Sequence, residues 1–164
     1  MITSKITVRE IRHHELYRLE EFLYEAIYQP DKNKKLPFEI IKIPKVYVYI
    51  DNFGKQEGDD CLVAELEGEL IGAVWTRILA GEIKGYGNID DKTPEFAISL
   101  FENFRNQGIG TLLMNEMIKR LRKDNYEQTS LSVNKENYAV KLYKNLGFEI
   151  VEENSDDYKM VLKL

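Results

Sequence analysis

The chain has 164 residues, of which 43% are hydrophobic and 31% charged, with a formal net charge of -5. This composition fits one globular domain over residues 1–164 and is too apolar for a disordered chain. The acidic balance disfavours nucleic-acid binding, and no apolar run approaches the roughly 20 residues of a membrane-spanning helix. The first residues lack the apolar core of a secretory signal, so we expect a cytoplasmic protein without a membrane partner.

Hydrophobic periodicity, punctuated by glycine, proline and asparagine, divides the chain into helices and strands. The expected elements are, in chain order, strand 5–9, helix 13–28, helix 38–53 with an interruption at Pro44, strands 61–66, 69–77 and 95–101, helix 108–123, strand 129–133, helix 135–146 with Asn134 as its N-cap, and strands 148–151 and 158–164. This order, βααβββαβαββ, predicts an α/β (α+β) fold with a central mixed sheet and helices on both faces.

The strand from Glu95 to Phe101 follows a stretch from Ala80 to Pro94 that holds three glycines and is expected to be a long mobile loop. Alternation along the strand should divide its side chains between the two faces of the sheet. Phe96, Ile98 and Leu100 are expected on one face, and Glu95, Ala97, Ser99 and Phe101 on the other.

Gly108 and Gly110 stand at the start of the helix after this strand. The first turn of a helix has backbone N–H groups without internal partners, and the helix dipole adds positive charge there. Glycine lets an anion approach closely, so the turn predicts a diphosphate site. A Walker loop is excluded because no Lys-Ser/Thr pair follows, and Leu113 stands where a dinucleotide fingerprint needs a small residue.

The motif Arg105-x-x-Gly108-x-Gly110 resembles the Arg/Gln-x-x-Gly-x-Gly/Ala signature of the GNAT N-acetyltransferases. A second segment, Leu131–Phe148, is similar to the other coenzyme A motif of that family, which reads strand, Asn, Ala, Leu-Tyr and Gly-Phe in this order. The resemblance covers nearly the whole chain and implies the GNAT acyl-CoA N-acyltransferase fold.

The resemblance also implies acetyl-CoA (coenzyme A) as the co-substrate and assigns its contacts. Backbone groups of Ile98 and Leu100 should pair with the pantetheine arm, and the amides from Gln107 to Thr111 should hold the pyrophosphate. Asn137 should contact the cofactor arm, and the Tyr143 hydroxyl should point at the thioester sulfur. The implied cofactor-binding residues are Ile98, Ser99, Leu100, Arg105, Asn106, Gln107, Gly108, Ile109, Gly110, Thr111, Asn137 and Tyr143.

Acetyl transfer to an amine needs a base for the amine and an acid for the thiolate. Tyr143, with an ordinary pKa of about 10, is the expected acid. Glu95 is the expected base, which would require a raised pKa or a chain of waters. The alternatives are a solvated strand-end role for Glu95 and core packing for Tyr143. No His/Cys/Asp cluster has metal spacing, so no metal is expected.

The predicted function is therefore direct acetyl transfer from acetyl-CoA to a primary amine. A covalent acetyl-enzyme is disfavoured because Cys61, its obvious carrier, lies in an apolar strand and should be buried. A non-catalytic module that senses acyl-CoA is the alternative, and the intact Tyr143 argues against it. The acceptor stays open among small amines, polyamines, aminoglycosides, amino acids and protein N-termini, and so does the choice between monomer and homodimer.

Overall fold

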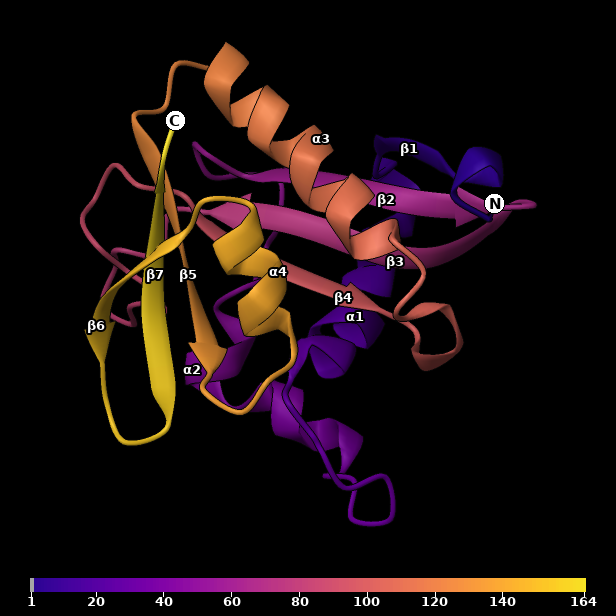
Figure 1. The fold of residues 1–164 in the computed structure, drawn as a ribbon, viewed down its shortest axis with the longest axis horizontal. Helices are drawn as coiled ribbons and strands as arrows, with labels where there is room; N and C mark the ends of the chain where they lie inside the picture. Colours follow the sequence, from indigo (N-terminus) through magenta and orange to yellow (C-terminus); the bar gives the residue numbers. More distant parts are fainter. Residues whose placement is uncertain (1) are drawn as a thin grey trace.

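The computed structural model describes residues 2–164, so Met1 of the predicted domain lies outside the described part. A seven-stranded sheet in the order β1-β2-β3-β4-β5-β7-β6 runs through the molecule (Figure 1). The strands are β1 (Thr7–Glu10), β2 (Asp60–Leu66), β3 (Glu69–Arg77), β4 (Glu95–Leu100), β5 (Gln128–Asn134), β6 (Glu149–Glu153) and β7 (Asp157–Lys163). The α-helices are α1 (Leu19–Ala26), α2 (Pro44–Tyr47), α3 (Ile109–Lys123) and α4 (Ala139–Asn145).

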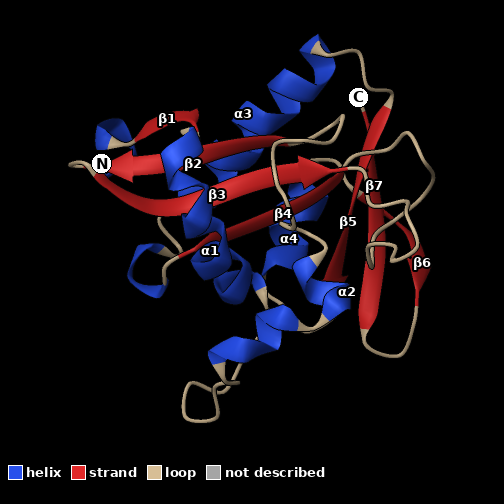
Figure 2. Ribbon diagram, turned by 180° about the vertical axis from the view of Figure 1, so that it is seen from behind, coloured by secondary structure: helices blue, strands red, loops and turns tan. Residues whose placement is uncertain are grey.

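Helices cover both faces of the sheet, as the sequence predicts. Helices α3 and α4 cover the face of the sheet that is toward the viewer in Figure 1. Helices α1 and α2 cover the opposite face, which is toward the viewer in Figure 2. The predicted alternation along β4 is confirmed, because Phe96 packs in the core under α3 while Ala97 and Phe101 pack in the core under α1. The order βααβββαβαββ is also confirmed.

The sheet opens between β4 and β5. These two strands are parallel and share a single register pair, Glu95 with Ser130, where the Ser130 amide donates to the Pro94 carbonyl at 3.1 Å. Beyond this pair β4 stays aligned with its antiparallel neighbours β3, β2 and β1. Strands β5, β7 and β6 run at a steep angle to them (Figure 1). The edge of β4 that faces β5 is therefore left without a strand partner over most of its length.

Three helix predictions were wrong in their bounds. The first helical region begins as a 3-10 helix, His13–Arg18, before α1. The second is interrupted at Pro44, as predicted, but it consists of a 3-10 helix, Phe38–Lys42, and the short α2, which ends at Tyr47 instead of residue 53. Proline at the first position of α2 fits there because that residue needs no N–H donor.

Helix α4 begins at Ala139 instead of Lys135. Asn134 belongs to β5, and the Asn137 side chain accepts from the Ala139 amide at 2.9 Å. The N-cap position of α4 is occupied by Tyr138, without a side-chain capping hydrogen bond, so the predicted cap at Asn134 is wrong.

Cys61 is buried, as expected, and burial raises the pKa of its thiol well above the usual range. A buried thiol with a raised pKa holds too little thiolate to carry an acetyl group. Among residues 2–164 no helix is long and apolar enough to cross a membrane.

Candidate active site

Glu95, the first residue of β4, is a buried carboxylic acid at the point where the sheet opens. Its residue exposure is 2%, and its side chain faces the α1 side of the sheet. The Tyr49 hydroxyl donates a hydrogen bond to Oε2, whereas Oε1 has no partner within residues 2–164. Ser130, its neighbour in the β5 register, is also buried with an unpartnered hydroxyl. Buried polar atoms without partners are uncommon, and here two occur on neighbouring strands at the opening of the sheet.

Burial raises the pKa of Glu95 to about 7 from its ordinary value near 4.5. The hydrogen bond from Tyr49, the nearby Gly87 amide and the positive charge of Lys159 favour the carboxylate and oppose this rise. Desolvation outweighs them because the charged form loses its water shell in the protein interior. A carboxylic acid that titrates near neutral pH is suited to accept a proton from an amine.

The glycine-rich loop before β4 covers this carboxylic acid. A Cβ on Gly85 would lie 2.1 Å from Oε1 of Glu95, and a Cβ on Gly87 would lie 2.7 Å from the backbone of Leu131 in β5. Only glycine lets the loop lie this close to both strands. The amide of Gly85 donates to the Leu79 carbonyl at 3.0 Å, which returns the loop to the end of β3.

The free edge of β4 presents alternating backbone groups toward the opening. Since the Pro94 carbonyl faces β5, alternation directs the backbone groups of Phe96, Ile98 and Leu100 the same way. The structure therefore brings two of the predicted cofactor residues, Ile98 and Leu100, to the open edge. Ser99 is not among them, because its backbone faces β3 and its hydroxyl donates to the Phe22 carbonyl at 2.7 Å.

Within residues 2–164, the turn between β4 and α3 has amides without a hydrogen-bond partner, as the sequence predicts. Gly108 has a φ of 85°, a left-handed conformation that favours glycine, and it stands as the N-cap of α3 without a side-chain hydrogen bond. The first helical amide with an internal acceptor is that of Leu112, which donates to the Gly108 carbonyl at 3.1 Å. The remaining predicted phosphate contacts, Asn106, Gln107, Ile109, Gly110 and Thr111, belong to this same turn.

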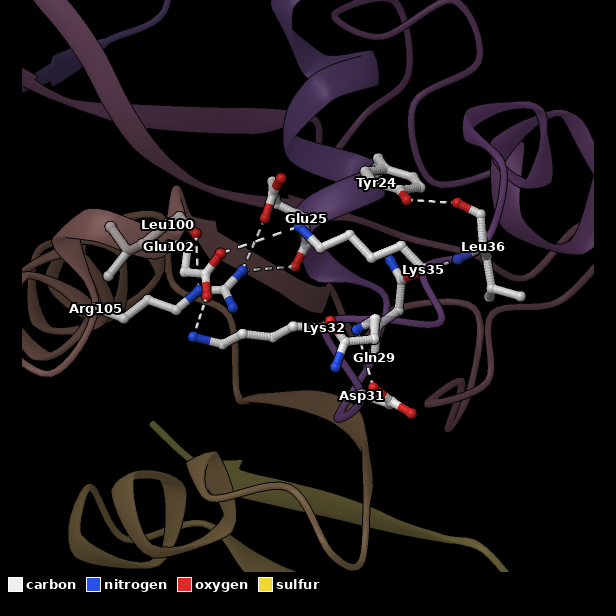
Figure 3. Close-up of polar contacts among 11 residues, drawn as sticks. Tyr24, Glu25, Gln29, Asp31, Lys32, Lys35, Leu36, Leu100, Glu102 and Arg105 are labelled. Carbon is white, nitrogen blue, oxygen red and sulfur yellow. Dashed lines mark hydrogen bonds and ion pairs between the residues drawn. The ribbon is translucent and has the colours of Figure 1, made fainter.

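Arg105 does not point into the turn but ties it to helix α1 (Figure 3). Its guanidinium donates to the Leu100 carbonyl at 3.0 Å and to the Glu25 carboxylate at 2.8 Å. Beside it, Lys32 and Lys35 from the loop after α1 pair with Glu102 (Figure 3). Arg105 thus braces the turn through Nε and Nη2, and its direct contact with the cofactor stays a prediction.

Tyr143 lies in α4 on the opposite face of the sheet from Glu95. Its ring packs edge-on against Phe148, with 6.0 Å between ring centroids, and burial raises the pKa of its hydroxyl to about 12. The hydroxyl has no hydrogen-bond partner among the described residues, so it keeps its proton and is free to donate to a ligand. The Asn137 side-chain oxygen accepts from the Ala139 amide at 2.9 Å just before α4, and its amide nitrogen stays available to a ligand.

Apart from Tyr49, histidine and aromatic side chains make no hydrogen bond to Glu95 among the described residues. His13 and His14 are exposed, and Phe53 is buried beneath the Arg77 guanidinium. Tyr28 donates across the opening to the Glu136 carbonyl at 3.3 Å, and Tyr86 is 53% exposed on the loop. No group of three or more potential metal ligands occurs within residues 2–164.

Sequence reasoning missed Tyr49, the direct partner of Glu95. Tyr49 lies 46 residues before Glu95 in a segment predicted to be helical, and nothing local to the sequence pairs the two. The aromatic residue alone carries no sign of a polar role, because tyrosines of this kind usually pack in a core.

The chain matches a family model described as Acetyltransferase (GNAT) family over residues 14–148. It is 35% identical over 111 residues to an N-alpha-acetyltransferase of Sulfolobus acidocaldarius, and the match spans 65% of each chain. An N-alpha-acetyltransferase of Sulfurisphaera tokodaii is 31% identical over 126 residues, which are 70% of this chain and 75% of that protein. The chain therefore belongs to the GNAT acetyltransferase family.

Solved structures agree on the fold. The PaiA N-acetyltransferase of Thermoplasma acidophilum, determined in complex with coenzyme A, superposes with a TM-score of 0.67 at 19% sequence identity. The match covers 97% of this chain and 99% of that one. At this level of identity the likeness concerns the fold and not the acceptor.

Proposed function

We propose that this protein is an acetyl-CoA-dependent N-acetyltransferase that acetylates the α-amino group of a peptide or protein directly. The observation that carries the proposal is the buried carboxylic acid of Glu95, with a pKa near neutrality, at the opening between β4 and β5. The family assignment and the two N-alpha-acetyltransferase relatives support the choice of reaction and of acceptor.

The described residues fit coenzyme A in two places. The unpaired amides around Gly108 suit the pyrophosphate, because backbone N–H groups and the helix dipole both favour an anion. The free edge of β4 at Ile98 and Leu100 suits the amide groups of the pantetheine arm, which can pair like an added strand. When bound there, acetyl-CoA would supply the acetyl group as an activated thioester.

Glu95 takes the amine proton in this proposal, and the pKa of the amine decides how unfavourable this transfer is. An α-ammonium group has a pKa of about 7.7–8.0, only about one unit above that of Glu95. A lysine-type ammonium has a pKa of about 10.4, so its proton transfer would be uphill by more than about three units, about 3 kcal/mol worse than for the α-amine. The lower pKa of an α-amine thus favours it over a lysine as the acceptor, in agreement with the relatives.

Tyr143 is the proposed acid for the departing thiolate. Its hydroxyl stays protonated at neutral pH and has no competing partner within the described residues. A pKa of about 12 makes Tyr143 a weaker acid than a free tyrosine. It therefore donates a hydrogen bond to the sulfur first, and its proton is transferred only late in the departure of the thiolate. An unpaired N–H on the β4 edge is available for the developing oxyanion.

A comparison of matched acceptors tests this function. One peptide has a free N-terminus and no lysine; the second has the same sequence with a blocked N-terminus and one lysine; spermidine is the third acceptor. Release of free thiol from acetyl-CoA should be at least about 100-fold faster with the first peptide, the ratio that a difference of about 3 kcal/mol implies.

Faster reaction with the blocked peptide or with spermidine would overturn the α-amine assignment. Binding of acetyl-CoA with no turnover on any of the three acceptors would overturn the enzymatic assignment and favour a sensor. We also propose a single domain and a cytoplasmic location, where a lone reduced cysteine such as Cys61 persists.

A further inference from the structure

A buried ion pair lies behind the site and takes no direct part in the proposed acetyl transfer. Arg77, the last residue of β3, donates two hydrogen bonds to the Asp59 carboxylate, at 2.8 Å each, and the two side chains are 2% and 1% exposed. Burying such a pair requires the removal of water from both charges, so it stabilises a fold poorly by itself. Arg77 is the cross-strand partner of Glu95, which places the pair beside the proposed base.

Arg77 also holds the turn after α2 against the sheet. Its guanidinium donates to the Val48 carbonyl at 3.0 Å and to the Asp51 carbonyl at 2.6 Å. Trp75, two residues earlier in β3, donates from its indole nitrogen to the Tyr49 carbonyl at 3.1 Å. The backbone on both sides of Tyr49 is thereby fixed by side chains of one strand.

The Tyr49 hydroxyl connects three parts of the molecule. It donates its one proton to Oε2 of Glu95 and accepts a hydrogen bond from the Tyr86 amide of the glycine-rich loop at 2.9 Å. Since the amide can only donate, the hydroxyl proton cannot turn toward the loop and stays directed at Glu95. Tyr49 is 8% exposed, so water does not compete freely for this hydroxyl.

We propose that Tyr49 is a positioning residue for Glu95, held in place by the Asp59–Arg77 pair, which fixes Oε2 and leaves Oε1 as the oxygen that receives the proton of the acceptor. The proposal rests on the proposed function, in which Glu95 is the base. The amine N–H bond breaks, the Oε1–H bond forms, and the nitrogen lone pair becomes free to attack the thioester carbon.

The arrangement also makes the base depend on the position of the loop. Gly85 lies against Oε1, and Tyr86, its neighbour, supplies the amide that directs the Tyr49 hydroxyl. Access of an acceptor to Oε1 requires a shift of the segment at Gly85, whereas the bond to Oε2 comes from Tyr49, outside this loop. The carboxylate is then exposed with one oxygen already oriented.

The groups that influence the titration of Glu95 can be named from each neighbouring element. Tyr49 from the turn after α2, the Gly87 amide from the loop and Lys159 from β7 all favour its charged form. Arg77 on β3 is committed to Asp59, and Ser130 on β5 is neutral. Of these, Tyr49 is the direct hydrogen-bond donor, so its removal should raise the pKa of Glu95 further.

A titration of the glutamate side chains by carbon-13 NMR tests the proposal without any substrate. Loss of one signal in Glu95→Gln assigns the resonance, and Tyr49→Phe removes the hydroxyl while the ring and backbone stay. We expect the midpoint of Glu95 to move upward by about one pH unit in Tyr49→Phe, the shift that the loss of one charge-assisted hydrogen bond implies.

Tyr47→Phe is the matched control, because Tyr47 lies two positions before Tyr49 in the chain and its hydroxyl donates to Glu20 instead of Glu95. It should leave the midpoint unchanged. An unchanged or lowered midpoint in Tyr49→Phe, or an equal shift in Tyr47→Phe, would overturn the proposal. If Tyr49→Phe folds poorly, the pH dependence of wild-type exchange at the Tyr49 hydroxyl serves instead: its protection should change at the Glu95 midpoint, and a pH-independent protection would contradict the assignment.

Activity measurements separate this proposal from the proposed function. In Tyr49→Phe, kcat/KM should fall at pH 7 and recover toward the wild-type value near pH 9, whereas a merely structural loss would lower it equally at both. The upward NMR shift without acetylation of any amine would refute the proposed function and leave the pairing of Tyr49 with Glu95 intact.

Discussion

Glu95 is an ionisable side chain in a place where its charge is unfavourable. It is almost completely buried, one of its oxygens has no partner among the described residues, and the loop glycines cover it. A carboxylic acid whose folded pKa lies above its ordinary value binds a proton in the folded state that the unfolded state releases. Function and stability are therefore opposed at this one residue, as is common at catalytic groups.

This opposition predicts a pH-dependent stability that depends on Glu95. The contribution of the protonated group is fully present below about pH 4.5 and is lost as the pH rises through about 7, where Glu95 ionises. At about 1.4 kcal/mol per pKa unit, the free energy of unfolding should fall by about 3 kcal/mol across this range. Glu95→Gln should lack this part of the fall.

Urea denaturation of both proteins at pH 5 and pH 8 measures the effect. The free energy of unfolding of Glu95→Gln, taken relative to that of the wild type, should be higher at pH 8 than at pH 5. Parallel changes in both proteins would show that Glu95 titrates at an ordinary pKa and is not the perturbed group described above.

At the scale of elements, the β4–α3 turn is joined to α1 by charged side chains. Arg105 connects Glu25 of α1 with the Leu100 carbonyl, and Lys32 after α1 pairs with Glu102 (Figure 3). The proposed pyrophosphate turn and the segment that precedes α2 therefore share one set of contacts. These contacts give the arginine of the motif a bracing role, which can be tested against the predicted direct contact to the phosphate.

Two substitutions distinguish bracing from direct binding at Arg105. If Arg105 braces the turn, both Arg105→Ala and Glu25→Gln should weaken coenzyme A binding about two- to five-fold, since the pair is partly exposed and worth about 0.5–1 kcal/mol. If Arg105 binds phosphate, Glu25→Gln would free it and leave binding unchanged or tighter.

Calorimetric titration with coenzyme A gives the dissociation constants. Glu116→Gln is the control, because it removes an exposed ion pair with Lys119 within α3 and should not alter them. A tighter complex in Glu25→Gln would contradict the bracing role.

At the scale of the whole molecule, the sequence predicts the order of elements and the face of each β4 side chain. It does so because periodicity and glycine positions are local properties. The start of α4 was misplaced because Asn134, the predicted cap, belongs to β5, and the end of that strand depends on its pairing with β7. The opening between β4 and β5 could not be foreseen, since it depends on the relative direction of two halves of the sheet.

The candidate site was predictable in part for the same reason. Glu95, Gly108 and Tyr143 belong to short motifs or strand ends, so the sequence could single them out. Tyr49 and the Asp59–Arg77 pair act through contacts between distant segments, and no local pattern marks them. The raised pKa of Glu95 likewise exists only because α2, the loop and two strands enclose it.

The pH dependence of kcat/KM, measured with a peptide α-amine for the wild type and for Glu95→Gln, tests the central claim most directly. In the wild type we expect a limb near pH 7 from Glu95 in addition to the titration of the amine itself. Glu95→Gln should lose the limb near pH 7 and about 100-fold or more in rate, while coenzyme A still binds. A Glu95→Gln enzyme with the wild-type rate and profile would contradict the account.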